Sequence, residues 1–166
     1  MKRLFLLIIL PVFFLCLFAQ FVSSQNLGPL AAEDVIKRKI YAYRGWQSTG
    51  VILQEGESFT LKAGGKWLYS PVVGYHGPEG SRHYRAPDFY PMPYLPGGCL
   101  IGRIGELGEP FYVGRSIRWT AQSPGPLYLR INDDILSDNN GFITFSVKIT
   151  GREGMTEKKT IDYEGR

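Results

Sequence analysis

The 166 residues include 19 Lys and Arg against 15 Asp and Glu, which gives a formal net charge of +4. The basic residues are scattered, as at 37–39 and 158–159, and do not form a stripe interleaved with aromatic side chains of the kind that follows a phosphate backbone. The charge pattern therefore argues against a nucleic-acid partner, and the length suits one domain with its own hydrophobic core.

Residues 1–24 are typical of a secretory signal peptide. Lys2 and Arg3 precede an apolar stretch over residues 4–19, and small residues then suit cleavage after Ser24. An uncleaved anchor is the alternative, since the apolar stretch approaches the ~18 residues that can span a bilayer. We expect cleavage, because Pro11 interrupts the stretch, and hence a secreted or periplasmic protein with no membrane span. Cleavage removes Lys2 and Arg3, so the formal net charge falls from +4 to +2.

Cleavage would also leave Cys99 as the sole cysteine, so no intramolecular disulfide can form. Leu100 and Ile101 beside it favour a buried thiol, and we assign Cys99 no chemical role.

Residues 39–150 predict an all-β domain. Short segments rich in β-branched and aromatic residues alternate with Gly, Pro, Asn and Asp. Every second residue is apolar in 59–63 and in 145–149, as expected for strands with one solvent-exposed face. Such strands either stack into two facing sheets or close into a barrel. The predicted strands are 39–43, 50–53, 59–63, 66–70, 99–104, 111–113, 116–121, 127–131 and 143–149.

The remaining local signals are weaker. Gly64-Gly65 predicts a turn, and Asn140-Gly141 is a hairpin signal. Residues 31–38 predict a short helix within an N-terminal extension over 25–38. The charged segment 151–166 predicts a disordered tail.

The segment 71–97 is a long predicted loop. It holds six of the 11 prolines, both histidines, and the aromatic residues Tyr75, Tyr84, Phe89, Tyr90 and Tyr94. Long loops inside compact domains are uncommon and usually functional, and proline lowers the entropy cost of holding one shape. The alternative is a structural flap whose aromatic side chains cover a sheet edge.

The segment 132–141 is the most polar part of the chain. Asp133, Asp134 and Asp138 stand among three asparagines, and calcium takes six to eight oxygen ligands from such groups. The spacing is not that of an EF-hand. A plain turn is the alternative, because Asp and Asn are common in turns, although three carboxylates in one loop repel one another unless solvent or a cation separates them.

The sequence contains no arrangement typical of an enzyme. It has no Gly-x-Ser-x-Gly elbow, no His-Glu-x-x-His pair and no Cys-His arrangement. A small hydrolase would need Glu79 or Asp88 to face Asp133 across a cleft, and nothing positions such a pair. We therefore expect a protein that is not an enzyme.

A family resemblance runs from about Tyr43 to Ile149. Several segments resemble the bacterial calcium-dependent galactose-specific lectins of the LecA type: 46–51, 56–67, a Tyr-x-Pro step at 69–71, Gly-Pro-x-Gly at 77–80, the strand 98–105, 118–121, Asn132-Asp133, and 139–141 with 145–149. The resemblance implies a jelly-roll-like, galactose-binding-domain-like β-sandwich in which a calcium ion bridges protein and sugar.

Calcium ligands follow from the resemblance residue by residue. It implies the backbone carbonyl of Tyr69, the carboxylate of Asp133, and a carbonyl near Leu136 or Ser137. It also implies an adjacent side-chain pair, which is either Asp138 with Asn139 or Asn139 with Asn140.

Sugar contacts carry over less directly, since the His-Pro contact of the family has no clear counterpart. We expect the sugar to contact His83, Asp88, Asp133, Asp134 and Asn139, with Tyr84, Phe89 or Tyr90 stacking on a sugar face. The predicted function is calcium-dependent carbohydrate binding, with a galactoside or related glycan as partner, and a homo-oligomer would add avidity. The alternative is a structural or envelope-associated interaction module that keeps the sandwich without a glycan site.

Overall fold

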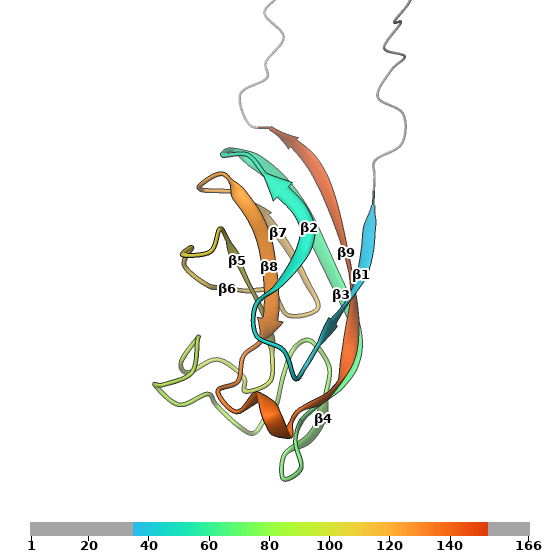
Figure 1. Cartoon of the computed structure of the whole chain (residues 1–166), viewed down its shortest axis with the longest axis vertical. Coiled ribbons are helices and arrows are strands. Elements are labelled where there is room, and N and C mark those ends of the chain that lie inside the picture. The colour runs from blue at the N-terminus through green and yellow to red at the C-terminus, as the bar shows by residue number, and fades with distance from the viewer. Residues whose placement is uncertain (1–34, 153–166) are drawn as a thin grey trace, which may run out of the picture. The chain divides into compact units, whose positions relative to one another are not determined.

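The computed structural model describes residues 35–152, which form two antiparallel sheets (Figure 1). This architecture confirms the predicted all-β class and the two-sheet β-sandwich. The expected signal segment and the tail beyond residue 152 lie outside the described residues. Within residues 35–152, no helix has the length and apolar character needed to cross a membrane.

The first sheet has the strand order β1-β9-β3-β4, and β7 pairs with another part of β3. Strand β3 therefore contacts β9 along most of its length, while β4 and β7 each pair with one end of it. The strands of this sheet are β1 (Ile36–Tyr41), β3 (Glu57–Ser70), β4 (Gly74–His76), β7 (Ser116–Thr120) and β9 (Asn140–Arg152).

The second sheet has the order β2-β8-β5-β6. Its strands are β2 (Gln47–Leu53), β5 (Leu100–Ile104), β6 (Phe111–Tyr112) and β8 (Gly125–Ile131). A 3-10 turn, η1 (Leu136–Asp138), connects β8 of this sheet to β9 of the first.

The core lies between the sheets, because the strands alternate buried and accessible residues as their sequences predict. Buried polar groups at this interface are hydrogen-bonded: Thr49 Oγ1 donates to the Leu127 carbonyl (2.8 Å) and Trp67 Nε1 to the Gly98 carbonyl (2.9 Å). The main apolar contributors are Leu53, Phe59, Leu61, Trp67, Leu100, Leu127, Leu129, Ile131, Ile143 and Val147.

Three local predictions were wrong. The helix expected over 31–38 is replaced from Ile36 onward by strand β1, which pairs with β9. Gly64-Gly65 is not a turn, since both residues continue β3 and pair with Thr144 and Ile143. Asn140-Gly141 begins β9 and forms no hairpin. In each case pairing along a neighbouring strand outweighs the local preference of the sequence.

The polar segment and the long loop meet at one end of the sandwich. Figure 1 shows η1, β4 and the loop that follows β4 together at the lower end of the strands. This end holds the candidate site.

Candidate functional site

Asp133 is the central acidic residue of the site. It lies two residues beyond the end of β8 and is only 2% exposed. Burial raises the pKa of its carboxyl group, and the side chains of Asn139 and Tyr90 counteract that rise because they face the carboxylate. The Ile135 amide also donates to Asp133 Oδ1 (3.3 Å). A buried carboxylate is therefore held at the end of the sandwich by neutral donors.

Tyr69 and Tyr90 connect β3 to this carboxylate. Their hydroxyl groups lie 2.9 Å apart. Burial raises the pKa of Tyr69 to about 12 and also raises the pKa of Tyr90, whose hydroxyl interacts with both Tyr69 and Asp133. Both phenols thus stay protonated and remain able to donate hydrogen bonds.

The backbone of Tyr69 lies beside residues 132–141, the polar loop. The β3 and β9 register ends with Leu68 opposite Asn140, so the next antiparallel step places Tyr69 opposite Asn139. The pairing of β3 with β4 is irregular between Leu68 and Ser70, which marks a bulge at Tyr69.

Two oxygen atoms of the loop are buried without a hydrogen-bond partner among the described residues: Asp138 Oδ1 and Asn139 Oδ1. Asn139 is 6% exposed, and its Nδ2 donates to the Ala42 carbonyl (3.4 Å), which fixes the direction of the amide. A buried acceptor left unpaired costs about 1–3 kcal/mol. These two oxygens therefore lack the partner that burial requires.

Exposure and existing hydrogen bonds distinguish the two side-chain pairs that the sequence leaves open, Asp138 with Asn139 and Asn139 with Asn140. Asn140 is exposed, and its Oδ1 already accepts a hydrogen bond from the Gly141 amide (2.7 Å). The unpaired oxygens belong to Asp138 and Asn139. The geometry thus favours Asp138 with Asn139 over Asn139 with Asn140.

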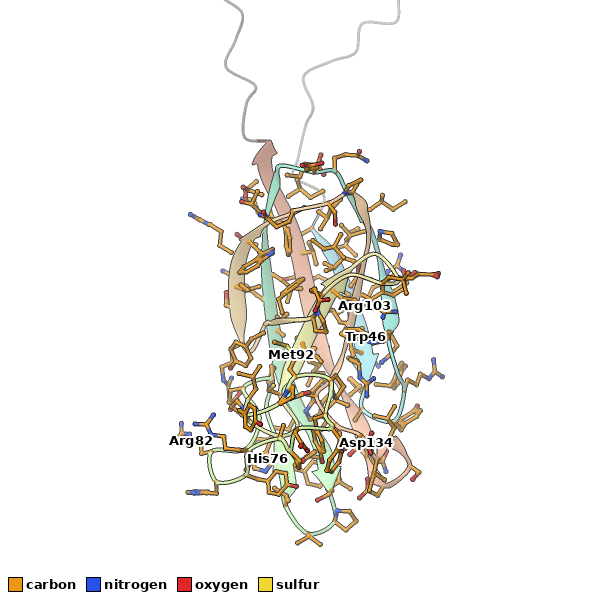
Figure 2. The ribbon with its side chains drawn as sticks, turned by 90° about the vertical axis from the view of Figure 1, so that its left-hand side faces the viewer. Trp46, His76, Arg82, Met92, Arg103 and Asp134 are labelled. Atoms are coloured by element: carbon orange, nitrogen blue, oxygen red, sulfur yellow. The ribbon has the colours of Figure 1, made fainter. Side chains whose placement is uncertain are left out.

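Asn132 fastens the long loop to this end of the sandwich. Its Oδ1 accepts from the Met92 amide (3.0 Å) and its Nδ2 donates to the Met92 carbonyl (2.8 Å), although the two residues are 40 positions apart. The Asn132 backbone also pairs with Gly98 and Cys99. Figure 2 shows Met92 in the loop region near the end of the strands, and Asp134 farther toward the tip.

Arg130 supports the backbone behind Asp133. Its guanidinium donates to the carbonyl oxygens of Ile131 (3.0 Å) and Asp133 (2.5 Å). Burial lowers the pKa of Arg130, whereas the negative charges of Asp133 and Asp134 raise it. A fixed positive group thus orients the start of the polar loop.

The other predicted site residues lie farther from this network. Ser137 and Asp134 are exposed on the loop, and His83 and Asp88 are exposed in the long loop. Within residues 35–152, no hydrogen bond or ion pair joins the side chains of His83 or Asp88 to Asp133. A hydrolase would need the carboxylate of Glu79 or Asp88 to face Asp133. The carboxylate of Glu79 instead pairs with Arg115 (2.8 Å).

The donor set limits which ion fits here. In the described part of the chain, no three His, Cys, Asp or Glu side chains come together as a metal-binding group. Two aspartates, an asparagine amide and nearby backbone carbonyls remain, and such oxygen-only sets suit hard cations such as calcium. The residues present therefore fit calcium better than a transition metal.

Sequence reasoning missed the contacts by which two residues build the site. Tyr90 was predicted only as one of three residues that could stack on a sugar, and the structure adds that its hydroxyl faces Asp133. Asn132 had no predicted role beyond matching a motif, whereas its side chain anchors Met92. The sequence signals for Asn132 were its place in the polar segment 132–141 and directly before Asp133.

Comparison with known proteins places this geometry in context. No protein-family model matches the chain, and no curated protein matches it. Among solved structures, the N-terminal domain of EclA, described as a PllA-like lectin, aligns with 69% of this chain and 95% of its own at 27% identity and a TM-score of 0.55. The chain therefore has a lectin-like fold. The likeness supports the lectin part of the predicted resemblance and leaves the LecA type as a prediction.

The polar loop carries the unpaired oxygens of Asp138 and Asn139, and the long loop 71–97 carries the exposed ring of Phe89. Phe89 is 65% exposed, and its ring centroid lies 5.4 Å from that of Tyr90. A buried acidic centre with an exposed aromatic ring beside it is an arrangement able to bind a polar ligand that also has an apolar face.

Proposed function

We propose that this protein is an exported lectin that binds carbohydrate through a calcium ion at the Asp133 end of the sandwich. The observation that carries the proposal is the pair of buried, unpartnered oxygens of Asp138 and Asn139 close in sequence to the buried carboxylate of Asp133. The solved lectin domain of similar fold supports the carbohydrate part, and the N-terminal sequence supports export.

Asp133, Asp138 and Asn139 would hold the ion through side-chain oxygens, with the backbone carbonyl of Tyr69 beside them. Bound calcium would offer open coordination positions to neighbouring sugar hydroxyls. The Tyr69 and Tyr90 hydroxyls hold the carboxylate side in place, and Arg130 holds the backbone behind it. These contacts preorganise the loop before any ligand arrives.

Phe89 would supply an apolar contact for the ligand. Sugar rings have one face of C–H groups that packs on aromatic rings, and Phe89 presents its ring to solvent next to Tyr90. This role refines the expectation that Tyr84, Phe89 or Tyr90 stacks on the sugar. A galactoside or a related glycan remains the proposed ligand class.

The first test is thermal unfolding of the full chain with calcium, with magnesium and with a chelator. A ligand present at 100 times its Kd stabilises the folded state by about 2.7 kcal/mol, so calcium should raise the melting temperature by several degrees. Asp133→Asn should abolish the rise. Asp88→Asn makes the same charge change at an exposed position in the long loop and should keep it.

The second test is retention on immobilised galactosides with and without calcium. Retention that requires calcium and is weakened by Phe89→Ala supports a lectin. A calcium shift without retention on any glycan would instead favour the interaction module, with calcium as a structural ion. If calcium does not raise the melting temperature, the calcium site is rejected.

A further inference from the structure

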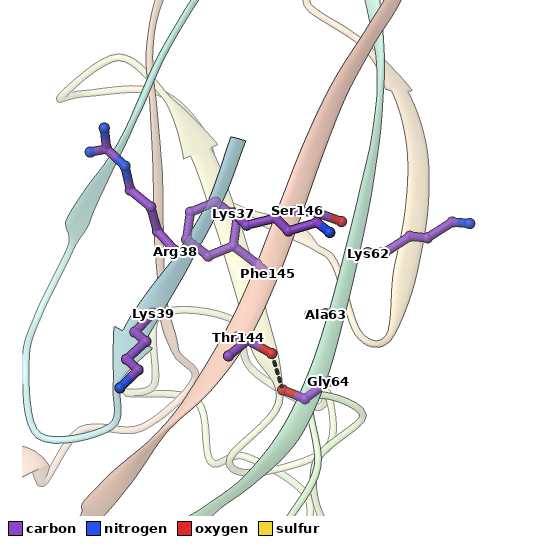
Figure 3. A pocket seen from close by; sticks show the side chains of 9 residues that line it. All are labelled: Lys37, Arg38, Lys39, Lys62, Ala63, Gly64, Thr144, Phe145 and Ser146. Carbon is purple, nitrogen blue, oxygen red and sulfur yellow. Dashed lines mark hydrogen bonds between the residues drawn. The ribbon is translucent and has the colours of Figure 1, made fainter. Parts of the chain in front are cut away.

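The outer face of the first sheet carries a second feature, distinct from the Asp133 end. A shallow groove of about 540 Å³ lies over β1, β9 and β3 (Figure 3). Two cross-strand rows line it: Lys37, Ser146 and Lys62 in one row, and Lys39, Thr144 and Gly64 in the other. The row between them, Arg38, Phe145 and Ala63, completes the lining. The two outer rows place two hydroxyl groups and a glycine beside the lysines.

The lysines stand on opposite sides of the central strand. Figure 3 shows Lys37 reaching from β1 over β9 toward Ser146, while Lys62 leaves β3 on the other side. Neighbouring strands are about 4.8 Å apart, so the backbones of Lys37 and Lys62 are separated by about 10 Å. All three groove lysines, including Lys39, are exposed.

Within the described strands of this face, acidic groups do not balance the positive charge. Glu57 is the one acidic residue in the five strands of this sheet, and it lies at the end of β3. Among residues 35–152, Lys37, Lys39 and Lys62 have no ion-pair partner. Lys66 on β3 and Arg118 on β7 are exposed on the same sheet, so the basic surface extends across three strands.

We propose that this groove binds a linear anionic polysaccharide whose carboxylate or sulfate groups pair with Lys37, Lys39 and Lys62. Ammonium groups provide the charge, and the Ser146 hydroxyl can donate to an anionic oxygen. The Thr144 hydroxyl donates to the Gly64 carbonyl (3.4 Å) and can still accept from a sugar hydroxyl. Charges spread over several strands match a ligand with repeated anionic groups better than a single ion. This binding requires no calcium and does not depend on the Asp133 site.

An anionic membrane is the competing source of negative charge. Surface binding to lipid normally combines basic residues with exposed apolar side chains that enter the interface. Phe142, beside the groove, is 39% exposed, and Lys39 Nζ lies 4.1 Å from its ring centroid. The two cross-strand rows themselves carry lysines, hydroxyl groups and a glycine, and no large apolar side chain that could enter a lipid interface.

The test measures binding of the full chain to dextran sulfate and to polygalacturonate, with neutral dextran as the blank and a chelator present throughout. Lys37→Gln with Lys62→Gln should weaken binding about tenfold, because two surface ion pairs are lost. Added salt should weaken the parent in the same way. Arg82→Gln with Arg85→Gln is the matched control, since it removes two exposed charges from the long loop and should bind like the parent.

Three outcomes would overturn the proposal. Unchanged binding by the lysine variant would show that the groove is not involved. An equal loss in the arginine control would show that net charge alone sets the affinity. Tighter binding to phosphatidylserine vesicles than to either polysaccharide, lost in the lysine variant, would assign the face to membranes.

Discussion

The hydroxyl group of Tyr69 on β3 lies 2.9 Å from the hydroxyl group of Tyr90, which comes from the long loop after β4. Tyr69 belongs to the buried core, whereas Tyr90 also faces the carboxylate of Asp133. The pair therefore joins three separate segments: strand β3, the long loop after β4 and the polar loop. Removing one hydroxyl should affect all of them.

Tyr90→Phe deletes that hydroxyl and keeps the ring. We expect a loss of about 1 kcal/mol in the free energy of unfolding, since one net hydrogen bond is lost and Tyr69 is left with an unpaired group. Urea denaturation measures it. Tyr94→Phe is the control, because Tyr94 is 74% exposed in the same loop and should change stability little. Equal losses in both variants would contradict a special role for the Tyr69 and Tyr90 pair.

Asn132→Ala should release the long loop. The substitution leaves the amide and carbonyl of Met92 without their partners and costs about 2 kcal/mol, the sum of two net hydrogen bonds. Hydrogen exchange should accelerate at the amide of Met92 and its neighbours while the amides of β9 stay protected. Asn140→Ala, at an exposed position, provides the comparison. Uniformly faster exchange over the whole sandwich would refute a local anchor.

The sequence predicted strands correctly where apolar and polar residues alternate regularly. The alternation in 59–63 and 145–149 marks the paired strands β3 and β9, because Phe59, Leu61, Phe145 and Val147 face the same core. Ile149, near the end of β9, is 43% exposed. The turn predicted at Gly64-Gly65 and the hairpin predicted at Asn140-Gly141 were wrong, because glycine allows a turn but does not require one. Gly65 (φ 102°) and Gly141 (φ 81°) take left-handed backbone angles within their strands, held by the partner strand.

The residue types of the candidate site could be predicted from the sequence, but the contacts between them could not. A loop with three aspartates and three asparagines drew attention to Asp133 directly, since such oxygen atoms either meet solvent or share a cation. The partnership of Asp133 with Tyr90 joins positions 43 residues apart, counting from one number to the other. Only the fold of the long loop sets that contact, and no local pattern encodes it.

Gly98 combines a left-handed backbone with close packing against Tyr69, and each should carry its own cost on substitution. It has φ of 73°, and a Cβ atom added to it would lie 2.7 Å from Cγ of Tyr69. Gly98→Ala should therefore cost about 1–2 kcal/mol for the left-handed backbone and about 1–3 kcal/mol more for the clash. Chemical denaturation measures the total.

Gly74 provides the control for the backbone term alone. Its φ is 89°, and a Cβ atom there would meet no atom within 4 Å. Gly74→Ala should cost only the backbone part, so the difference between the two variants isolates the packing against Tyr69. Equal destabilisation would show that Tyr69 shifts freely, and the tight arrangement inferred around it would then be wrong.

Cys99 offers a test of burial through its chemistry. Its side chain is fully buried, and burial raises the pKa of the thiol to about 12. The reactive thiolate is therefore nearly absent in the folded state at pH 8. Treatment with iodoacetamide, followed by peptide mapping to separate Cys99 from Cys16, should leave Cys99 unmodified until urea unfolds the protein.

The same pKa predicts how stability depends on pH. The folded state holds the thiol proton more tightly than the unfolded chain, so the contribution of Cys99 is complete below the unfolded pKa and is lost as the pH rises toward 12. Between roughly pH 9 and 11 this loss approaches about 1.4 kcal/mol per pH unit. Tyrosines and lysines titrate in the same range, so the quantity to compare is the stability difference between the parent and Cys99→Ala. That difference should shift against the parent as the pH rises, whereas a constant difference would mean that the thiol reaches solvent.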